Sequence, residues 1–424
     1  MKIEKVMERV YNRERLQTAW QQVRSNAGTA GIDNVSVEEF GKQEEKYLEL
    51  AHEKLENGHY RFKPARRALI PKPGTTKERK LGIPVVLDRV VSQSINLVLA
   101  EIFDSSFTES NFGFRKGKSQ HQAVGYTRHT IGEGYGWCVS IDLKSFFDEI
   151  PHGLIFKLLR RKIKDERLIT LIARALKAGV IVNGKFEKTT KGVPQGSPLS
   201  PILSNIVLNE LDHELERRGH KYVRWADDFL IFVKSERAGK RVKEGITRYL
   251  EEELELAINE EKSKIITSNK AEFLSFQILK GKIRISTKSK KTFKEKIREL
   301  TKRNNPVSMY KIIQELNEYL RGWIEYFRIQ EFHKPIEELD GYIRSRLRSM
   351  QLKKWKKPKK FQRMMIAQGI NPKEATETWV NMRKWKSVLR REVNFTLNLN
   401  WFRRLGLISL VNYTQRNLEF RFSY

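Results

Sequence analysis

The sequence predicts an α+β fold, in which a sheet covered by helices on one side is followed by a helical region. Three observations support this. Strand-like and helix-like patterns are interspersed through the first two thirds of the chain, at least one pair of extended segments reads as a hairpin, and long basic amphipathic helices follow Gly281. At 424 residues the chain is long enough for two or three domains with buried cores.

The first elements are helical. Residues 4–56 alternate charged and apolar positions at helical spacing, with a loop predicted at NAGTAGIDN (26–34). Residues 61–89 contain prolines, which exclude helix interiors, and a Gly-Thr-Thr turn between basic flanks, so we expect a basic hairpin. A helix from about Asp88 to Phe103 and a loop over 105–119 should follow.

The middle of the chain alternates between strands and helices. We expect, in order, a strand in WCVSIDLKSFF (137–147), a helix after Pro151, a loop at KGVPQGSPLSP (191–201), a helix from about Ile202 to Arg218, and a hairpin around YVRWADDFLIFVKS (222–235). Long helices are expected over 292–303, 309–329 and 335–357. A domain boundary should lie near 281–288, and a small basic tail module carries Trp379, Trp385 and Trp401.

The charge of the chain points to a polyanionic partner. The sequence has 82 Lys and Arg against 51 Asp and Glu, a formal net charge of +31. Residues 281–424 hold 34 basic and 13 acidic residues, so one third of the chain carries +21 of this charge. Scattered lysines can simply keep a surface soluble, but an excess of this size favours nucleic acid.

Other classes of protein are disfavoured. No window reaches the roughly 18 uninterrupted apolar residues of a membrane span, so we expect no membrane partner. The charged start of the chain does not resemble an export signal, and the single cysteine, Cys138, permits a reducing compartment. We therefore expect a cytoplasmic protein.

Acidic residues interrupt apolar strands at two places, Asp142 and the pair Asp227 and Asp228. If the two strands are neighbours in one sheet, the three carboxylates converge. Mg²⁺ would then satisfy them, because it prefers hard oxygen ligands and takes a few carboxylates together with substrate phosphates. Two such ions can activate a 3′-hydroxyl and stabilise a leaving pyrophosphate. The plainer readings are a solvated Asp-Asp turn and an edge or capping aspartate.

Several ordered motifs carry a family resemblance. They are IPKP (70–73), FGFRKGKS (112–119), SIDLKSFFD (140–148), GVPQGSPLSPILSNIVLNELD (192–212), YVRWADD (222–228), NEEKSKI (259–265) and FLSF (273–276). Together they resemble the reverse transcriptases of bacterial group II introns, over roughly residues 10–280. NEYLRGWIEYFR (317–328) is similar to the helical maturase segment, or thumb, of that family.

The resemblance implies a right-hand polymerase, with fingers, a palm built on an antiparallel sheet, and an α-helical thumb or maturase domain. It implies an N-terminal extension and fingers over 1–85, a fingers and palm core over 86–283, the thumb or maturase domain over 284–358, and a basic nucleic-acid-binding module over 359–424. No nuclease segment is expected after the tail.

Residue roles follow from the resemblance by position. Asp142, Asp227 and Asp228 match the catalytic acids that bind two Mg²⁺ ions, and the Leu143 carbonyl is expected as an extra ligand. Phe147 matches the bulky gate that excludes a ribose 2′-hydroxyl, although it also reads as ordinary core. The remaining substrate-binding candidates are Arg66, Lys72 and Arg79 on the basic hairpin, Gln195 and Gly196 beneath the nascent base pair, and Lys262 near the leaving phosphates.

The alternative reading of Lys262 is a surface ion pair. Three positions depart from the family pattern, because Trp225 replaces the usual Tyr, and Ser197 and Ser275 each replace a Gly.

The function implied is an RNA-directed DNA polymerase that extends a DNA primer or target with dNTPs on an RNA template. Its second role is that of a maturase that binds group II intron RNA. In the basic helical region, cations dispersed among aromatic side chains suit structured RNA, although a thumb that grips only the primer and template is the plainer reading. Two alternatives stay open: a non-catalytic RNA-binding splicing factor, and a stand-alone reverse transcriptase in defence or repair.

Overall fold

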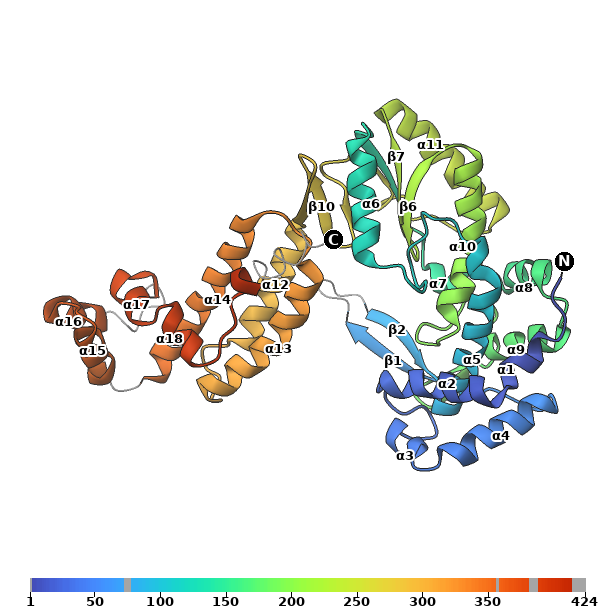
Figure 1. The fold of residues 1–424 in the computed structure, drawn as a ribbon, viewed down its shortest axis with the longest axis horizontal. Helices are drawn as coiled ribbons and strands as arrows, with labels where there is room; N and C mark the ends of the chain where they lie inside the picture. The colour runs from blue at the N-terminus through green and yellow to red at the C-terminus, as the bar shows by residue number, and fades with distance from the viewer. Residues whose placement is uncertain (1, 72–77, 356–357, 381–387, 414–424) are drawn as a thin grey trace. The chain divides into compact units, whose positions relative to one another are not determined.

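The computed structural model describes residues 2–71, 78–355, 358–380 and 388–413 (Figure 1). The chain forms two compact units, Met1–Leu274 and Ser275–Tyr424. The border expected from the sequence, near residues 281–288, comes later in the chain than the border between these units, because the hairpin over residues 276–285 belongs to the second unit. None of the described helices is long and apolar enough to cross a membrane.

The first unit opens with four helices, as expected. They are α1 (Val6–Tyr11), α2 (Arg13–Ser25), α3 (Val37–Gly41) and α4 (Glu44–Glu56), and the predicted loop separates α2 from α3. Ser36 starts α3 with a capping box, in which its side chain accepts a bond from the Glu39 backbone and Glu39 bonds back.

The basic hairpin is confirmed. Strands β1 (Ala65–Pro71) and β2 (Glu78–Ile83) pair antiparallel. On its other edge β1 pairs in parallel with β4 (Val180–Val182), which forms a second hairpin with β5 (Lys185–Glu187). The Gly-Thr-Thr turn lies outside the described residues.

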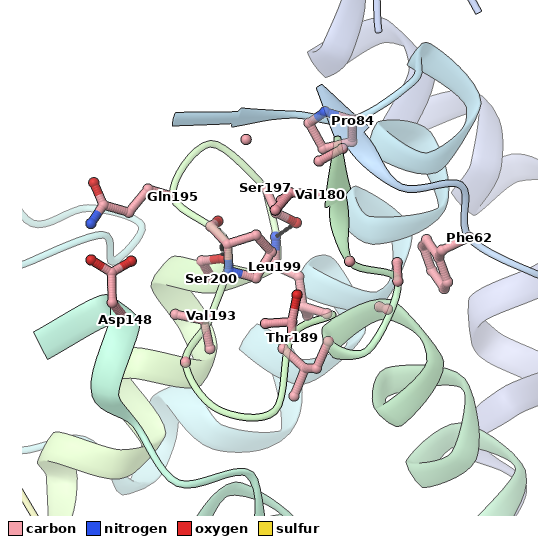
Figure 2. A pocket seen from close by; sticks show the side chains of 18 of the residues that line it. Phe62, Pro84, Asp148, Val180, Thr189, Val193, Gln195, Ser197, Leu199 and Ser200 are labelled. Carbon is pink, nitrogen blue, oxygen red and sulfur yellow. Dashed lines mark hydrogen bonds between the residues drawn. The ribbon is translucent and has the colours of Figure 1, made fainter. Parts of the chain in front are cut away.

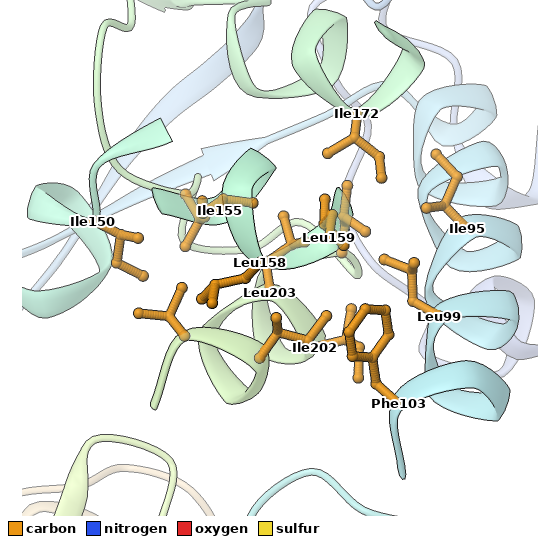
Figure 3. Packing of buried hydrophobic residues seen from close by; sticks show 14 of the residues in the cluster. Ile95, Leu99, Phe103, Ile150, Ile155, Leu158, Leu159, Ile172, Ile202 and Leu203 are labelled. Atoms are coloured by element: carbon orange, nitrogen blue, oxygen red, sulfur yellow. The ribbon is translucent and has the colours of Figure 1, made fainter. Parts of the chain in front are cut away.

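Helices build the core of this unit. They are α5 (Val86–Phe103), the short η1 (Asp104–Ser106), α6 (Gln120–Gly132), α7 (Phe146–Glu149), α8 (His152–Lys162), α9 (Glu166–Leu176) and α10 (Ser200–Arg217). Figure 3 shows side chains of α5, α8, α9 and α10 meeting, with Leu99, Leu159 and Leu203 fully buried. The predicted helices near 88–103 and 202–218 are confirmed within two residues.

The central sheet has four antiparallel strands in the order β6-β7-β3-β8. They are β3 (Trp137–Ile141), β6 (Lys221–Trp225), β7 (Asp228–Val233) and β8 (Lys264–Thr267), and β7 leads into α11 (Glu236–Arg248) and the π-helical turn η2 (Tyr249–Glu253). A two-residue strand, β9 (Glu272–Phe273), ends the unit.

Both faces of this sheet are buried, which corrects the expectation of helices on one side. Val139 and Ile231 belong to the main core, whereas Cys138 and Phe232 belong to a second cluster that includes Ala123 of α6. Successive strand side chains point to opposite faces, so a strand in which neighbouring residues are all apolar needs cover on both sides.

The second unit begins with the hairpin of β10 (Phe276–Leu279) and β11 (Lys282–Ile285) and continues with helices. They are α12 (Thr287–Leu300), α13 (Met309–Phe327), α14 (His333–Lys354), α15 (Pro358–Ala367), α16 (Pro372–Val380), α17 (Arg391–Thr396) and α18 (Leu399–Arg404). The three predicted helices are confirmed as α12 to α14 with shifted ends. Aromatic rings hold α12 to α13, where Phe293 lies 4.4 Å from Trp323 between ring centroids.

Residues 405–410, which follow α18 and which we call the C-terminal segment, contact α13 and α14. Asn317 binds it through two contacts: its side-chain amide donates to the Gly406 carbonyl at 2.8 Å, and its carbonyl oxygen accepts from the Ile408 amide at 3.2 Å. Asp340 accepts bonds from the Ser409 hydroxyl at 2.7 Å and the Leu410 amide at 3.0 Å. Two buried polar side chains thus fix the path of an irregular segment far along the chain.

Candidate active site

The two acid-bearing strands are neighbours, as expected. Ile141, the last residue of β3, pairs with Phe229 of β7, so Asp142 and Asp228 come next at the same end of the strands. Trp225 pairs with Asp228, which leaves Ala226 and Asp227 as a two-residue turn between β6 and β7. The sheet register therefore brings these three aspartates to one end of the central sheet.

The electrostatics of Asp227 and Asp228 show that negative charge accumulates here. Loss of water around its carboxyl group, and then the charges of Asp227, Asp142 and Glu272, raise the pKa of Asp228 to about 7. The pKa of Asp227 is also raised, mainly by desolvation and next by Asp142, against the charges of Arg79 and Arg224.

Protein atoms crowd the carboxyl group of Asp228 and remove part of its water. The residue is nevertheless exposed, so solvent can still reach it. That access screens its charge. A reachable carboxylate among like charges favours the approach of a cation.

Asp142 is held by its backbone and faces a lysine. Its amide donates to the Ser263 hydroxyl at 3.1 Å, and its carbonyl accepts from the Asn259 amide at 2.7 Å. The Lys262 ammonium lies 3.3 Å from its carboxylate. Both side chains are substantially exposed, so this ion pair contributes little stability and can open.

A magnesium ion fits this end of the sheet by the chemistry of its donors, which are hard carboxylate oxygens. Within the described residues, no three acidic, histidine or cysteine side chains form a ready-made metal cluster. Mg²⁺ usually takes only one or two carboxylates and completes its shell with waters and substrate phosphates. The arrangement therefore matches an ion shared with a substrate better than a closed protein cage.

Leu143 and Phe147 lie between β3 and α8. Leu143 is buried and pairs with Ile258 in an isolated bridge. Phe147 is half-buried against the main core, with its ring 5.4 Å from that of Phe146, and its carbonyl accepts from the Val193 amide at 2.6 Å. The ring of Phe147 thus packs against the core and is also partly accessible to solvent. This position is compatible with a gate for the ribose 2′-hydroxyl and with an ordinary core residue.

The loop that carries Gln195 and Gly196 is pressed between two other segments. The Gly82 amide of β2 donates to the Gln195 carbonyl at 2.8 Å. Gly196 has φ +110°, and a Cβ there would lie 2.6 Å from the Gly82 carbonyl oxygen. At the other end, a Cβ on Gly192 would meet Asp148 at 2.5 Å. Glycine is required at both positions because no side chain fits.

A pocket of about 420 Å³ lies beside this loop (Figure 2). Phe62, Val180 and Leu199 give it apolar walls, and the backbone of the loop forms one side. Charged side chains of both signs line it, namely the basic Lys63, Arg67, Lys80, Lys188 and Lys191 and the acidic Asp88, Asp148, Glu149 and Glu187. Gln195 lines it as well, so this predicted residue borders an open and polar space.

The three candidates on the basic hairpin differ in their surroundings. Arg79 is exposed on β2 and lies close enough to Asp227 to lower the pKa of that carboxyl. Arg66 is half-buried, and its guanidinium donates to the Ala30 carbonyl at 2.8 Å. Lys72 lies outside the described residues. Arg79 is therefore the hairpin cation that the structure brings to the acids.

Two parts of the sequence match known protein families. Residues 70–278 match the family described as reverse transcriptase (RNA-dependent DNA polymerase), and residues 290–367 match the group II intron maturase-specific domain. Protein YkfC of Escherichia coli is 35% identical over 277 residues, which cover 56% of this chain and 72% of YkfC.

The chain belongs to the group II intron type of reverse transcriptase. The group II intron-encoded protein LtrA of Lactococcus lactis is 30% identical to this reverse transcriptase over 343 residues, which cover 64% of the chain but only 57% of LtrA. A putative COX1/OXI3 intron 1 protein of Saccharomyces cerevisiae is 31% identical, and the chain covers 38% of it. Among solved structures, an apo telomerase from Candida tropicalis has a TM-score of 0.42 at 15% identity, over 53% of this chain and 55% of that one.

The structure gives a setting to each of the three positions at which this reverse transcriptase departs from the expected family pattern. Trp225 is half-buried with its ring 6.3 Å from that of Phe114. Ser275 has φ +69°, a conformation that glycine adopts more easily, so a glycine at this position would be relaxed. The Ser197 hydroxyl accepts from the Leu199 amide at 3.4 Å, within the loop.

Sequence reasoning missed the buried side chains of this reverse transcriptase that support the aspartate turn. Arg224 is fully buried and is bonded to Asp212 and Asn205 of α10. A signal was present, because an arginine between apolar residues of a strand must find a buried carboxylate. Asn205 and Asp212 stand seven residues apart on one face of α10, and both are buried.

Proposed function

We propose that this reverse transcriptase extends a DNA primer or DNA target strand with dNTPs on an RNA template, and that it binds group II intron RNA as a maturase. The observation that carries the first part is the register of the sheet, which gathers Asp142, Asp227 and Asp228 at one end of β3 and β7. The match to the maturase-specific domain supports the second part.

The three aspartates would hold two Mg²⁺ ions, with the Leu143 carbonyl as a further oxygen ligand. Bound there, the ions would supply charge stabilisation for the attacking 3′-oxygen and the leaving pyrophosphate. The protein contributes placement, because the paired strands hold Asp142 and Asp228 side by side before any substrate binds. The neighbouring negative charges that help to raise the pKa of Asp227 and Asp228 would be neutralised by a bound cation.

Side chains around the acids would bind the nucleotide. We assign Arg79 and Lys262 to the triphosphate, since one acts on the charge of Asp227 and the other already lies beside Asp142. Lys72, which lies outside the described residues, is assigned to the triphosphate by resemblance alone. Arg66, which donates to the Ala30 carbonyl, would reach a phosphate only by exchanging that bond.

Two further assignments concern the sugar and the base. The accessible part of the Phe147 ring would crowd a ribose 2′-hydroxyl. Gln195 and Gly196 would lie beneath the new base pair. Gly196 has no side chain, which allows its backbone to lie close to that of Gly82.

The second unit would bind RNA. We assign 284–358 to the thumb or maturase domain and 359–424 to a basic nucleic-acid-binding module, with 1–85 as N-terminal extension and fingers and 86–283 as the catalytic core. Residues 281–424 carry a net charge of +21, which suits a phosphate-rich partner. The similarity to LtrA supports intron RNA as this partner and the bacterial cytoplasm as the location.

Primer extension tests the polymerase proposal. Purified chain is given an RNA template, an annealed DNA primer, dNTPs and Mg²⁺. Asp142→Asn and Asp227→Asn should each lower extension about 10³-fold or more, because each removes a charge that would hold the metal. Glu236→Gln, an exposed acid on α11 paired with Lys240, is the matched control and should extend normally.

Wild-type activity in both aspartate variants would contradict the proposal. Intron splicing by a wild-type chain that incorporates no nucleotide would instead favour a non-catalytic splicing factor.

A further inference from the structure

The turn that carries Asp227 and Asp228 rests on a buried polar network. Arg224, on the strand that leads into the turn, is 0% exposed. Its Nε donates to one Asp212 carboxylate oxygen at 2.8 Å, its Nη2 donates to the other oxygen, and its Nη1 donates to the Asn205 side-chain oxygen at 3.0 Å. The same Nη1 donates to the Ala226 carbonyl at 3.0 Å. One side chain therefore bridges helix α10 and the residue just before Asp227.

The backbone at this point needs support. Ala226 has φ +57°, in the left-handed region that residues other than glycine rarely occupy. Such a conformation persists where surrounding contacts determine it. The bond from Arg224 to the Ala226 carbonyl is such a contact, and it fixes the peptide that precedes Asp227.

A second loop is locked to the same network. The Asn205 side-chain amide donates to the Gly113 carbonyl at 2.7 Å. A Cβ on Gly113 would lie 2.4 Å from the Ala226 nitrogen, so this loop presses directly on the turn. Its backbone also pairs with Arg224, since the Phe112 amide donates to the Arg224 carbonyl and the Arg224 amide donates to the Ser110 carbonyl, both at 2.9 Å.

The charges within this network neutralise each other. The side chains of Arg224 and Asp212 are both fully buried and form a two-bonded ion pair. A guanidinium neutralised in this way is not available to a substrate. Its effect on the catalytic acids is therefore mainly geometric, through the Ala226 carbonyl and through Asn205.

We propose that Arg224 and Asn205 are positioning residues, which lock the Ser110–Gly113 loop and the Ala226–Asp227 turn together so that Asp227 and Asp228 are preorganised for divalent cations. This inference rests on the proposed function. Groups that orient metal-binding carboxylates without touching the metal commonly change metal affinity about 10- to 100-fold when they are removed.

Two variants separate positioning from folding. Asn205→Ala removes the bridge between Arg224 and Gly113. Asn209→Ala is its matched control, because Asn209 lies one turn further along α10 and donates instead to the Ser106 carbonyl at 3.2 Å. The double variant Arg224→Met with Asp212→Leu replaces the whole ion pair by apolar side chains, an exchange that proteins often tolerate, whereas a single replacement would leave a buried charge unpaired.

The measurement is Mn²⁺ binding to the full chain by electron paramagnetic resonance, without nucleic acid, together with thermal unfolding and the Mg²⁺ concentration that half-saturates primer extension. We expect Asn205→Ala and the double variant to unfold close to the wild-type temperature. Each should bind Mn²⁺ about 10-fold more weakly and shift the half-saturating Mg²⁺ upward by a similar factor. Asn209→Ala should match wild type in both readouts.

The inference is overturned if Asn205→Ala, folded as wild type, keeps wild-type Mn²⁺ affinity and Mg²⁺ dependence. It is equally overturned if Asn209→Ala weakens metal binding as much as Asn205→Ala does. These outcomes leave the proposed function intact, since wild type would still bind metal and extend primers. A wild-type chain that does neither would remove the proposed function itself and this inference with it.

Discussion

Two buried aspartates, one in each unit, bind distant chain segments in the same way but have different charged neighbours. Asp88 of α5 accepts from the Tyr60 hydroxyl at 2.7 Å and the Lys63 amide at 2.9 Å, and burial raises its pKa to about 6. Asp340 of α14 likewise accepts one hydroxyl and one amide, from Ser409 and Leu410. The Arg344 guanidinium lies 3.7 Å from the Asp340 carboxylate.

The comparison extends to the functional groups of the two units. In the first unit, the carboxylates of Asp227 and Asp228 lie at one end of the sheet, where desolvation and the charge of Asp142 raise the pKa of both. Residues 281–424, by contrast, carry a net charge of +21. We therefore expect salt to act mainly on RNA binding by the second unit, and metal binding to depend on the first.

The largest expected effect concerns salt and the second unit. If it contacts about six phosphates, RNA affinity should fall about 10³-fold between 50 and 200 mM salt. Lys288 and Lys291 are exposed near the start of α12, and replacing both with Gln should weaken binding and lower the salt slope by about 2. Filter binding over a salt series measures this.

Lys240→Gln, on α11 of the first unit and paired with Glu236, is the control and should leave that slope unchanged. If Lys240→Gln lowered the salt slope as much as the α12 variant does, RNA binding would not be specific to the second unit.

The next effect concerns Asp340. Asp340→Ala leaves the buried Leu410 amide without its acceptor, so the free energy of unfolding should fall by about 2–3 kcal/mol. Urea unfolding of the full chain measures this. Glu337→Ala, an exposed acid on the same helix, should change it little. Mn²⁺ binding should persist in the Asp340 variant, and its loss would show that the two units are not independent.

The next effect concerns the proposed role of Phe147 in excluding ribonucleotides. Phe147→Val should raise ribonucleotide incorporation relative to deoxyribonucleotide incorporation about 10- to 100-fold, because space opens for the 2′-hydroxyl. Competition between rCTP and dCTP in single-nucleotide extension measures the ratio. An unchanged ratio in a stable variant would make Phe147 a core residue only.

The smallest effect is the pH dependence from Asp88. Its folded pKa of about 6 lies above the ordinary value of 3.8, so the folded state favours the protonated form. Stability from this group is therefore full below about pH 4, falls by about 1–3 kcal/mol as pH rises to about 6, and is constant above that. Asp88→Asn should remove this slope in urea unfolding at several pH values. Tyr60→Phe should move it to higher pH, since the Tyr60 hydroxyl lowers the pKa.

Much of this architecture could be predicted from the sequence, because it depends on local patterns. Proline and glycine placed the basic hairpin, helical spacing placed α5, α10 and α13, and acids that interrupt apolar runs marked Asp142 and Asp228. The pairing of β3 with β7 was a condition in that reasoning, and the structure supplies it. Cover on both faces of the sheet was missed, because α6 is only weakly amphipathic and gives no clear periodic signal.

The contacts that could not be predicted join residues far apart in the chain. Arg66 was read as a free phosphate ligand, yet it meets the carbonyl of Ala30, 36 residues away. The hydrogen bond from Asn317 to Gly406 joins residues 89 positions apart. A buried polar side chain indicates that a hydrogen-bond partner is needed, but only the folded chain shows which partner it is.

The most direct test of the account replaces Mg²⁺ with Fe²⁺ in the presence of a reductant and peroxide, so that hydroxyl radicals cut the backbone near the bound ion. The account predicts cuts beside residue 142 and beside residues 227 and 228 in the wild-type chain, and their loss in Asp227→Ala but not in Glu236→Gln. Cuts confined to other regions, or cuts near 142 and 228 that persist unchanged in Asp227→Ala, would contradict it.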